Sequence, residues 1–223
     1  MTRSLDRLRQ AVEESQDEYV HKLDSQWMST VPDEYRGHSI REAIGGTVRN
    51  ANGSTYESNG GWNGSLTDSD IDQIADYIDE PTKFAILRGT AGTGKSTLAA
   101  SLGRKIVHDR QVAGAFVTSV TMLREFSYSM DTNPVKHYAS FGVLVIDDLG
   151  AVNESLTARQ QQSLWNLIEA RWSARNLFTI ITTNMAIQDN AQGLGLSSWI
   201  GESGWDRIAS DLTRVNMSGE SFR

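Results

Sequence analysis

The eight residues from Gly89 to Ser96 constrain the fold of this chain more than any other segment. Their order is Gly-x-x-x-x-Gly-Lys-Ser, and they lie between an apolar run, Phe84–Leu87, and a helical pattern that begins at Lys95. A glycine-rich turn between a strand and a helix curls backbone N–H groups around phosphate oxygens, and the helix N-terminus adds its positive dipole. The segment therefore predicts a phosphate-binding loop in an α/β sheet.

Two side chains of this loop have the chemistry of a nucleoside triphosphate site. The Lys95 ammonium is expected to neutralise the β and γ phosphates, and the Ser96 hydroxyl is expected to bind Mg²⁺. ATP and Mg²⁺ are therefore the predicted cofactors. The predicted nucleotide-binding residues are Gly89, Thr90, Ala91, Gly92, Thr93, Gly94, Lys95, Ser96 and Thr97.

A second apolar run, Val143–Ile146, ends in two acidic residues, Asp147 and Asp148. Its uninterrupted apolar character is typical of a parallel strand that is covered on both faces. An aspartate at this strand end holds the magnesium shell of P-loop proteins, so Asp147 joins Ser96 as a predicted metal ligand. Asp148 is predicted to orient or deprotonate the attacking water. Many ATPases of this kind use glutamate there, and the shorter aspartate side chain predicts slow hydrolysis.

A third polar group follows the apolar run Phe178–Ile181, where the sequence reads Thr182-Thr183-Asn184. Ligands of open α/β sheets bind at the carboxyl ends of the strands. The Asn184 amide is therefore predicted to reach the γ-phosphate or the attacking water.

Strands and helices alternate from Lys83 onward, which predicts a parallel sheet flanked by helices and joined by right-handed crossovers. Leu98, Ala99, Leu102 and Ile106 are expected on the buried face of the first helix of this series. The expected strands cover residues 84–87, 115–117, 143–146 and 178–181, and the expected helices cover residues 95–107, 122–128 and 157–172.

The N-terminal part of the chain predicts a helical extension. Residues 1–30 are predicted as an amphipathic helix, and residues 31–223 as the ATPase domain, with a flexible Gly/Asn/Ser-rich loop at 50–65. A further helix, capped by Thr67 or Asp68, is expected before Pro81. The long helix either packs on its own domain or docks a partner through residues 4–28. Its apolar stripe consists of Leu5, Leu8, Val12, Tyr19, Leu23 and Trp27.

Composition excludes several classes of function. The chain has no cysteine, which rules out disulfides and cysteine-based zinc sites, and its four histidines show no ligand spacing. A net charge of −7 disfavours non-specific binding of duplex DNA. Neither a bilayer-spanning apolar run nor a secretory signal is evident, so a cytoplasmic protein without membrane contact is expected.

Together these motifs resemble the AAA+ ATPases of the bacterial and phage helicase-loader type, the DnaC-like group, which is related to IstB-type transposition helper ATPases. Four smaller segments agree with the resemblance, which covers roughly residues 31–223. They are Val31–Arg36, Ile146–Gly150, Ala170–Trp172 and Gly219–Arg223. The resemblance implies an ATP hydrolase that delivers a replicative ring helicase onto single-stranded DNA and assembles as a homo-oligomer.

One box of the family departs from its usual pattern. The segment that supplies an arginine to the neighbouring subunit normally reads Arg-apolar-x-small-Arg-Leu, but here Asp211 replaces the second arginine. The resemblance then leaves Arg207 or Arg214 as the catalytic arginine that acts in trans. Alternatively, Arg207 forms a surface ion pair with Glu202 or Asp211, and the self-assembled protein hydrolyses ATP poorly.

Contact with DNA rests on two segments that mix cations with aromatic rings, Arg124–Tyr128 and Lys136–Tyr138. Proteins that bind single strands use this mixture for backbone attraction and base stacking. A mixed helix with an apolar face is the competing interpretation. The alternative functions are a transposition helper and an ATP-binding switch or scaffold with little hydrolysis, while Thr182–Asn184 argues against a small-molecule kinase.

Overall fold

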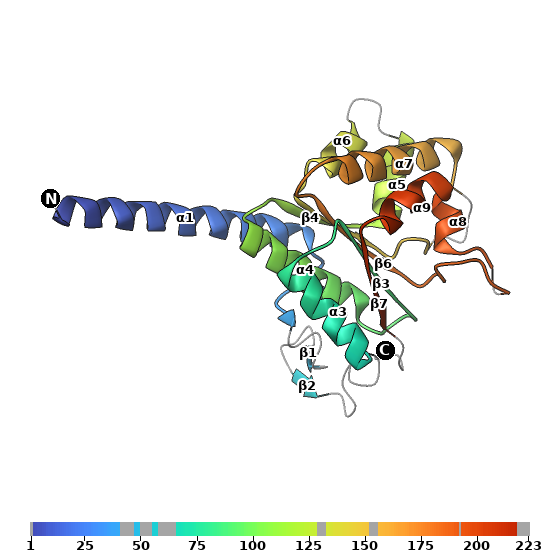
Figure 1. Cartoon of the computed structure of the whole chain (residues 1–223), viewed down its shortest axis with the longest axis horizontal. Coiled ribbons are helices and arrows are strands. Elements are labelled where there is room, and N and C mark those ends of the chain that lie inside the picture. Colours follow the sequence, from blue (N-terminus) through green and yellow to red (C-terminus); the bar gives the residue numbers. More distant parts are fainter. Residues whose placement is uncertain are drawn as a thin grey trace.

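The computed structural model describes the backbone of residues 2–40, 47–49, 55–57, 66–128, 133–151, 156–191 and 193–217, and the side chains of these residues except 2–13, 47–49, 55–57 and 68. Within this part, a five-stranded parallel sheet has the order β4-β5-β6-β3-β7 (Figure 1). The strands are β3 (Phe84–Gly89), β4 (Gly114–Thr118), β5 (Val143–Asp147), β6 (Phe178–Thr183) and β7 (Leu212–Met217). The predicted P-loop α/β fold is confirmed.

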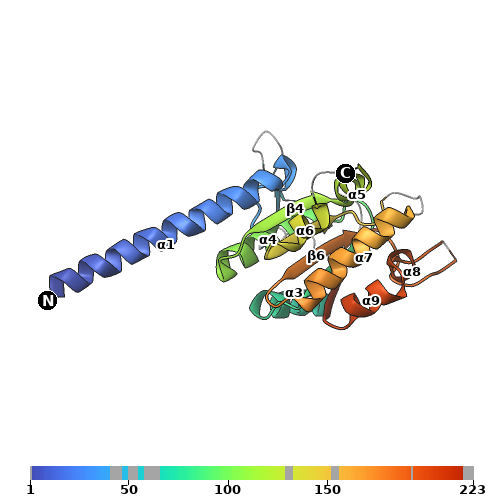
Figure 2. The ribbon, with the colours of Figure 1, turned by 90° about the horizontal axis from the view of Figure 1, so that it is seen from above.

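Helices cover both faces of the sheet (Figures 1 and 2). One apolar core joins the sheet to α1 (Thr2–Thr30), α3 (Asp68–Asp79) and α4 (Lys95–Arg110), and a second core lies on the opposite face. All five residues of β5 are buried, as its uninterrupted apolar run predicted. The second core contains α5 (Ser119–Tyr128), α6 (Pro134–Ala139), α7 (Ala158–Ser173), α8 (Leu196–Ile200) and α9 (Glu202–Ala209).

Side chains at the helix ends explain where two of these helices begin. Thr67 caps α3, because its side chain accepts a hydrogen bond from the Asp70 N–H while the Asp70 carboxylate accepts one from the Thr67 backbone. Thr157 and Gln160 form the same box before α7. The four residues expected on the inner face of α4 are all buried.

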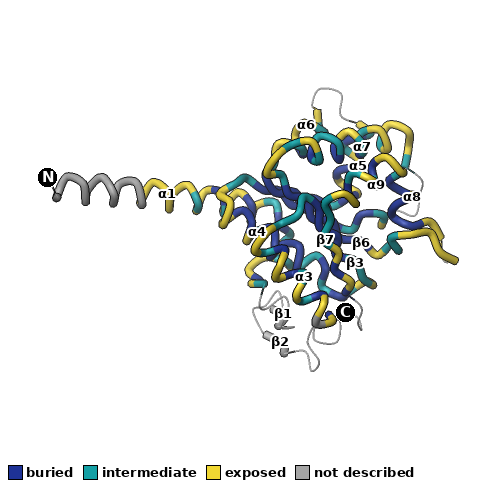
Figure 3. The backbone as a smooth tube through the Cα atoms, in the orientation of Figure 1, coloured by how far each residue is buried: buried dark blue, intermediate teal, exposed yellow. Residues whose placement is uncertain are grey.

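The expected N-terminal helix is present as α1, and it divides into two parts. Leu23 and Trp27 are buried in the first core, and Asp24 forms a bidentate ion pair with Arg104 of α4, at 2.7 and 2.8 Å. Residues 14–19 are exposed, as the tube in Figure 3 shows, and the Tyr19 side chain is 51% exposed. The C-terminal part of α1 therefore packs on its own domain, whereas the Tyr19 side chain does not take part in this packing.

The indole of Trp27 fits against two glycines of the domain. A Cβ atom added to Gly103 of α4 would lie 2.5 Å from this ring, and one added to Gly114 of β4 would lie 2.7 Å from it. Glycine at both positions therefore makes the space in which α1 is anchored. No helix in the described ranges has both the length and the apolar character needed to cross a bilayer.

Arg171 at the end of α7 ties that helix to the sheet from inside the core. Its guanidinium donates hydrogen bonds to the Thr179 hydroxyl at 2.7 Å and to the carbonyls of Tyr138, Phe141 and Phe178 at 3.1, 2.8 and 2.7 Å. Burial lowers the pKa of Arg171 to about 9, so the group remains charged at neutral pH. The Ala170–Trp172 segment therefore has a structural role through Arg171.

Some elements differ from the sequence-based expectation. The strand β2 (Thr55–Glu57) lies inside the predicted loop 50–65 and pairs with β1 (Thr47–Arg49), while the rest of that loop lies outside the described residues. The short 3₁₀ helix η1 (Asp33–Tyr35), α6, α8, α9 and β7 were not predicted. The closing segment Gly219–Arg223 also lies outside the described residues.

Candidate nucleotide-binding site

The predicted phosphate-binding loop joins β3 directly to α4, as the motif requires. Gly92 and Gly94 have φ angles of +81° and +80°, a left-handed conformation that a Cβ atom disfavours. Gly89 has no space for a side chain, because an added Cβ would lie 2.0 Å from the Met217 carbonyl oxygen of β7. The loop therefore presents its backbone without side chains at its turning points.

Inside the loop, two side chains fold over the same carbonyl. The Thr93 hydroxyl donates to the Thr90 carbonyl at 2.9 Å, and the Lys95 ammonium donates to it at 2.7 Å. Both side chains are buried. Lys95 thus brings a positive charge into the loop at the N-terminus of α4, where phosphate oxygens gain both the charge and the helix dipole.

Asp147 is the last residue of β5 and connects three parts of the site. It is 5% exposed, and its carboxylate accepts a hydrogen bond from the Thr182 hydroxyl of β6 at 2.7 Å and another from the Ser96 hydroxyl of the P-loop. Burial raises the pKa of Asp147 even though both hydrogen bonds lower it. A carboxylate beside a hydroxyl is a hard oxygen pair that suits Mg²⁺, so the predicted ligands Ser96 and Asp147 fit this ion.

Asp148 leaves the direction of the strand and turns toward β6. Its φ angle is +57°, an uncommon left-handed conformation that aspartate tolerates better than most residues. The backbone is held there because the Asp148 N–H donates to the Thr182 hydroxyl at 2.7 Å and its carbonyl accepts from the Ser119 hydroxyl at 2.7 Å. The carboxylate then accepts a hydrogen bond from the Asn184 amide at 3.2 Å.

The strand order explains why these groups meet. Because β6 lies between β5 and β3, Asn184 stands at a strand end between Asp148 and the P-loop. The sequence analysis missed the role of Thr182, whose hydroxyl bonds both Asp147 and Asp148. Its only signal was a threonine at the end of an apolar strand.

The two candidate arginines lie on the C-terminal elements. Arg207 of α9 forms an ion pair with Glu169 of α7 and donates to the Ser203 carbonyl at 3.0 Å. The prediction that Arg207 pairs with Glu202 or Asp211 is therefore wrong, because its partner is Glu169. Arg214 of β7 is exposed, and its guanidinium lies 5.5 Å from the centre of the Trp205 ring.

The segments proposed to contact DNA lose two of their aromatic rings to the core. Phe126 and Tyr138 are buried, and the Tyr138 hydroxyl donates to Glu125 at 2.8 Å. Arg124 and Lys136 are exposed, and Tyr128 is 79% exposed. Base stacking in these segments is therefore restricted to fewer rings than the sequence suggested, and contact with single-stranded DNA stays a prediction.

Comparisons with known proteins show which family the chain belongs to. The chain is similar to a solved structure of DnaI, with 25% identity and a TM-score of 0.55 over 70% of this chain and 83% of that one. It shares the fold of the DnaC helicase loader, with 21% identity and a TM-score of 0.59 over 83% of this chain and 100% of that one. No curated protein matches the sequence. The model of the family described as IstB-like ATP binding protein matches residues 66–223, which include the P-loop, Asp147, Asp148 and Asn184, and the chain belongs to this family.

Proposed function

We propose that this protein is an AAA+ ATPase that delivers a replicative ring helicase onto single-stranded DNA. The observation that carries the proposal is the meeting of Lys95, the Ser96–Asp147 pair and the Asp148–Asn184 pair at adjacent strand ends. The loader assignment is supported by the likeness to DnaI and by the fold shared with the DnaC helicase loader.

The phosphates of ATP are bound by the backbone of residues 89–97, and Lys95 exchanges the Thr90 carbonyl for the β and γ phosphates. Ser96 and Asp147 are the residues that hold Mg²⁺. The ion, when bound, neutralises negative charge on these phosphates. The raised pKa of Asp147 reflects a buried carboxyl whose charge is costly until a cation compensates it.

Hydrolysis uses Asp148 and Asn184. Asp148 orients a water and accepts its proton, while the water oxygen bonds to the γ-phosphorus and the bond to the β–γ bridging oxygen breaks, which releases ADP and phosphate. The hydrogen bond from Asn184 fixes the Asp148 carboxylate in place. An arginine of a neighbouring copy, Arg207 or Arg214, stabilises the charge that develops on the γ-phosphoryl group.

The exposed part of α1 docks the helicase. The anchoring of Leu23, Trp27 and Asp24 suggests a deletion that separates docking from folding, because a chain lacking residues 1–18 retains all three. We expect this variant to bind ATP with an affinity within about twofold of the full chain, since the P-loop is untouched, and to lose capture of the ring helicase. Calorimetry with ATP and co-purification with the helicase measure the two effects.

The full chain is the positive control for helicase capture, and its Tyr19→Ala variant tests the exposed part of α1 without a deletion. Equal capture of the helicase by the full chain and by the deleted chain would contradict docking through α1. Thermal unfolding of each variant identifies any loss of capture that is caused by misfolding.

A second candidate function, a transposition helper, is favoured by the family match itself. The same co-purification experiment distinguishes the two functions when a transposase is offered in place of the helicase. The third candidate, an ATP-binding switch or scaffold, predicts that ATP is bound but not turned over when helicase and single-stranded DNA are both present.

A further inference from the structure

Part of the strand-end site lies beyond the last paired residues of the sheet. The ladder between β3 and β6 ends with Arg88 opposite Thr183, and Asn184 follows at the point where β6 ends. Strand pairing with β3 therefore does not fix the backbone of Asn184 and Met185. Because Asn184 is exposed, its hydrogen bond to Asp148 depends on what holds the chain at this turn.

Arg88 supplies a connection beyond the end of the ladder. Its Nε–H donates a hydrogen bond to the Met185 carbonyl at 2.9 Å. A hydrogen bond from a charged donor is stronger than one between neutral groups, so a single contact of this kind can hold a turn. Arg88 also directly precedes Gly89. The bond therefore joins the beginning of the P-loop to the residue that follows Asn184.

Two further contacts hold Met185. Its N–H donates to the Thr183 hydroxyl at 3.1 Å, and that hydroxyl donates to the Leu149 carbonyl at 2.7 Å. Its side chain lies against Gly150, where an added Cβ atom would collide with the Met185 sulfur. Met185 is thus tied on one side to the segment that follows β5 and on the other side, through Arg88, to β3.

Charge pairing does not explain an arginine at this position. Among the described residues, no carboxylate forms an ion pair with Arg88, and the residue is partly buried. Holding a long side chain in one conformation costs entropy, and partial burial of an unpaired cation costs hydration. The contact that offsets these costs is the hydrogen bond to the Met185 carbonyl.

We propose that Arg88 is a positioning residue that couples the P-loop to the Asp148–Asn184 pair. By holding the Met185 carbonyl, it fixes the turn from which the Asn184 amide reaches the Asp148 carboxylate at 3.2 Å. The inference rests on the proposed ATPase function, in which this carboxylate orients the attacking water. Arg88 acts through Asn184 and takes no part in the chemical step.

The test measures ATP turnover in the presence of single-stranded DNA, together with ATP binding by calorimetry. Arg88→Met keeps a long side chain and removes the donor. We expect it to lower kcat by about 10- to 10²-fold, the effect of misplacing a group of the site by up to about 1 Å, with ATP affinity unchanged. Arg88→Lys retains a charged donor and should recover part of the lost kcat. If Arg88 only supported the P-loop, its loss would weaken ATP binding, and that result would overturn the proposal.

A double-mutant cycle decides whether Arg88 acts through Asn184. If it does, Arg88→Met should lower kcat in the parent and add almost nothing to the loss already caused by Asn184→Ala. Losses that multiply in the double variant would overturn the proposal, because they would show that the two residues act independently.

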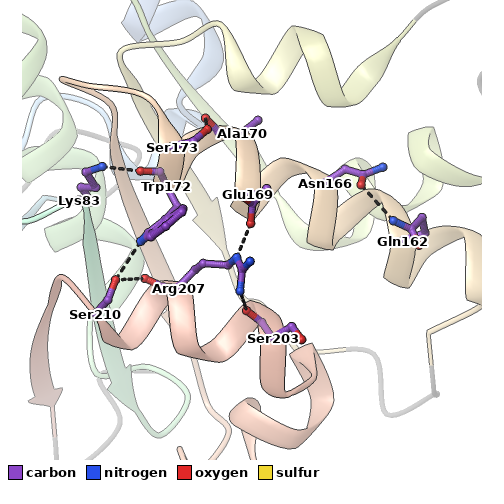
Figure 4. Close-up of polar contacts among 10 residues, drawn as sticks. All are labelled: Lys83, Gln162, Asn166, Glu169, Ala170, Trp172, Ser173, Ser203, Arg207 and Ser210. Carbon is purple, nitrogen blue, oxygen red and sulfur yellow. Dashed lines mark hydrogen bonds and ion pairs between the residues drawn. The ribbon is translucent and has the colours of Figure 1, made fainter.

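Lys83, at the other end of β3, provides the matched control. It also donates to backbone carbonyls, that of Trp172 (Figure 4) and, at 3.1 Å, that of Ala174. Lys83→Met removes contacts of the same kind at the end of the strand opposite the P-loop, so Tm should fall without a change in kcat. Thermal unfolding of Lys83→Met and Arg88→Met separates the loss of stability from the loss of turnover.

The Asp148→Asn variant separates failure of this inference from failure of the proposed function. An unchanged kcat in Arg88→Met, together with lost turnover in Asp148→Asn, would overturn the role of Arg88 and leave the ATPase proposal standing. Normal turnover by Asp148→Asn would contradict the proposed mechanism of hydrolysis and, with it, the coupling through Arg88.

Discussion

The strand-end site and the α7–α9 face both carry charged side chains, but different forces hold them in place. At the strand ends the backbone sets the geometry, through the left-handed Gly92, Gly94 and Asp148 and the buried hydroxyl of Thr182. On the α7–α9 face, side chains that are 38 residues apart, Glu169 and Arg207, fix one another. The first arrangement follows from the backbone at the ends of neighbouring strands, while the second depends on how two helices pack.

The two regions also differ in electrostatic cost. Asp147 is a buried carboxylate, whereas Glu169 and Arg207 are about one-third exposed, a setting in which an ion pair adds little to stability. The difference predicts that the strand-end charges cost stability in the absence of nucleotide, whereas the α7–α9 ion pair has little effect on stability in either direction. Substitutions at the strand ends test this contrast.

The largest expected effect is that of Asp148→Asn on turnover. The amide cannot accept the proton of the attacking water, so we expect kcat to fall by about 10²- to 10⁴-fold, the usual contribution of a general base. ATP affinity should remain near that of the parent, because the Asp148 carboxylate bonds Asn184 and, among the described residues, no hydrogen bond joins it to the P-loop. Single-turnover hydrolysis and calorimetry give the two quantities, and a parallel loss of affinity would place Asp148 among the binding groups.

A smaller effect is expected for Lys95→Ala, which removes a charge-assisted contact to the phosphates. ATP affinity should fall by about 10- to 150-fold, the equivalent of roughly 1.5–3 kcal/mol. Lys105→Ala is the matched control, because Lys105 lies on the same helix and pairs with Asp109 at its surface. Equal affinities of the two variants in calorimetry would show that Lys95 does not bind phosphate.

These contrasts explain how much could be predicted from the sequence. The P-loop and the apolar strands β5 and β6 are contiguous segments, so their structure and their polar ends follow from local patterns. The partner of Arg207 was not predictable, because no local pattern shows that α7 and α9 pack together. The edge strand β7 was missed for a related reason, since Leu212–Met217 mixes polar with apolar residues and lacks an uninterrupted apolar run. The exposure of Tyr19 was not predictable either, because it depends on the point at which α1 extends beyond the surface of the domain.

The smallest expected effect is that of Asp147→Asn on stability, and it measures the electrostatic cost of burying the Asp147 carboxylate. Burial raises the folded-state pKa of Asp147 above 3.8, so the folded chain binds more protons than the unfolded chain between 3.8 and the raised value. The stability of the parent therefore falls as pH rises through this window, and the cost is fully present above the raised pKa. Without nucleotide, Asp147→Asn should raise Tm at pH 7 by roughly 1–3 °C, and the gain should shrink as the pH approaches 3.8.

With Mg²⁺ and ATP, the order of the two proteins should reverse. A ligand at about 100 times its Kd stabilises the folded state by about 2.7 kcal/mol. The parent should gain this stability, and Asp147→Asn should gain less because it lacks the carboxylate proposed to hold Mg²⁺. Thermal unfolding with and without Mg²⁺–ATP measures both orders, and Asp72→Asn on the exposed side of α3 is a control for loss of a surface charge. If Asp147→Asn has a lower Tm than the parent without nucleotide, the hydrogen bonds from Thr182 and Ser96 outweigh the cost of burying the charge. The strand-end site would then resemble the α7–α9 face, because its charges would not lower the stability of the fold.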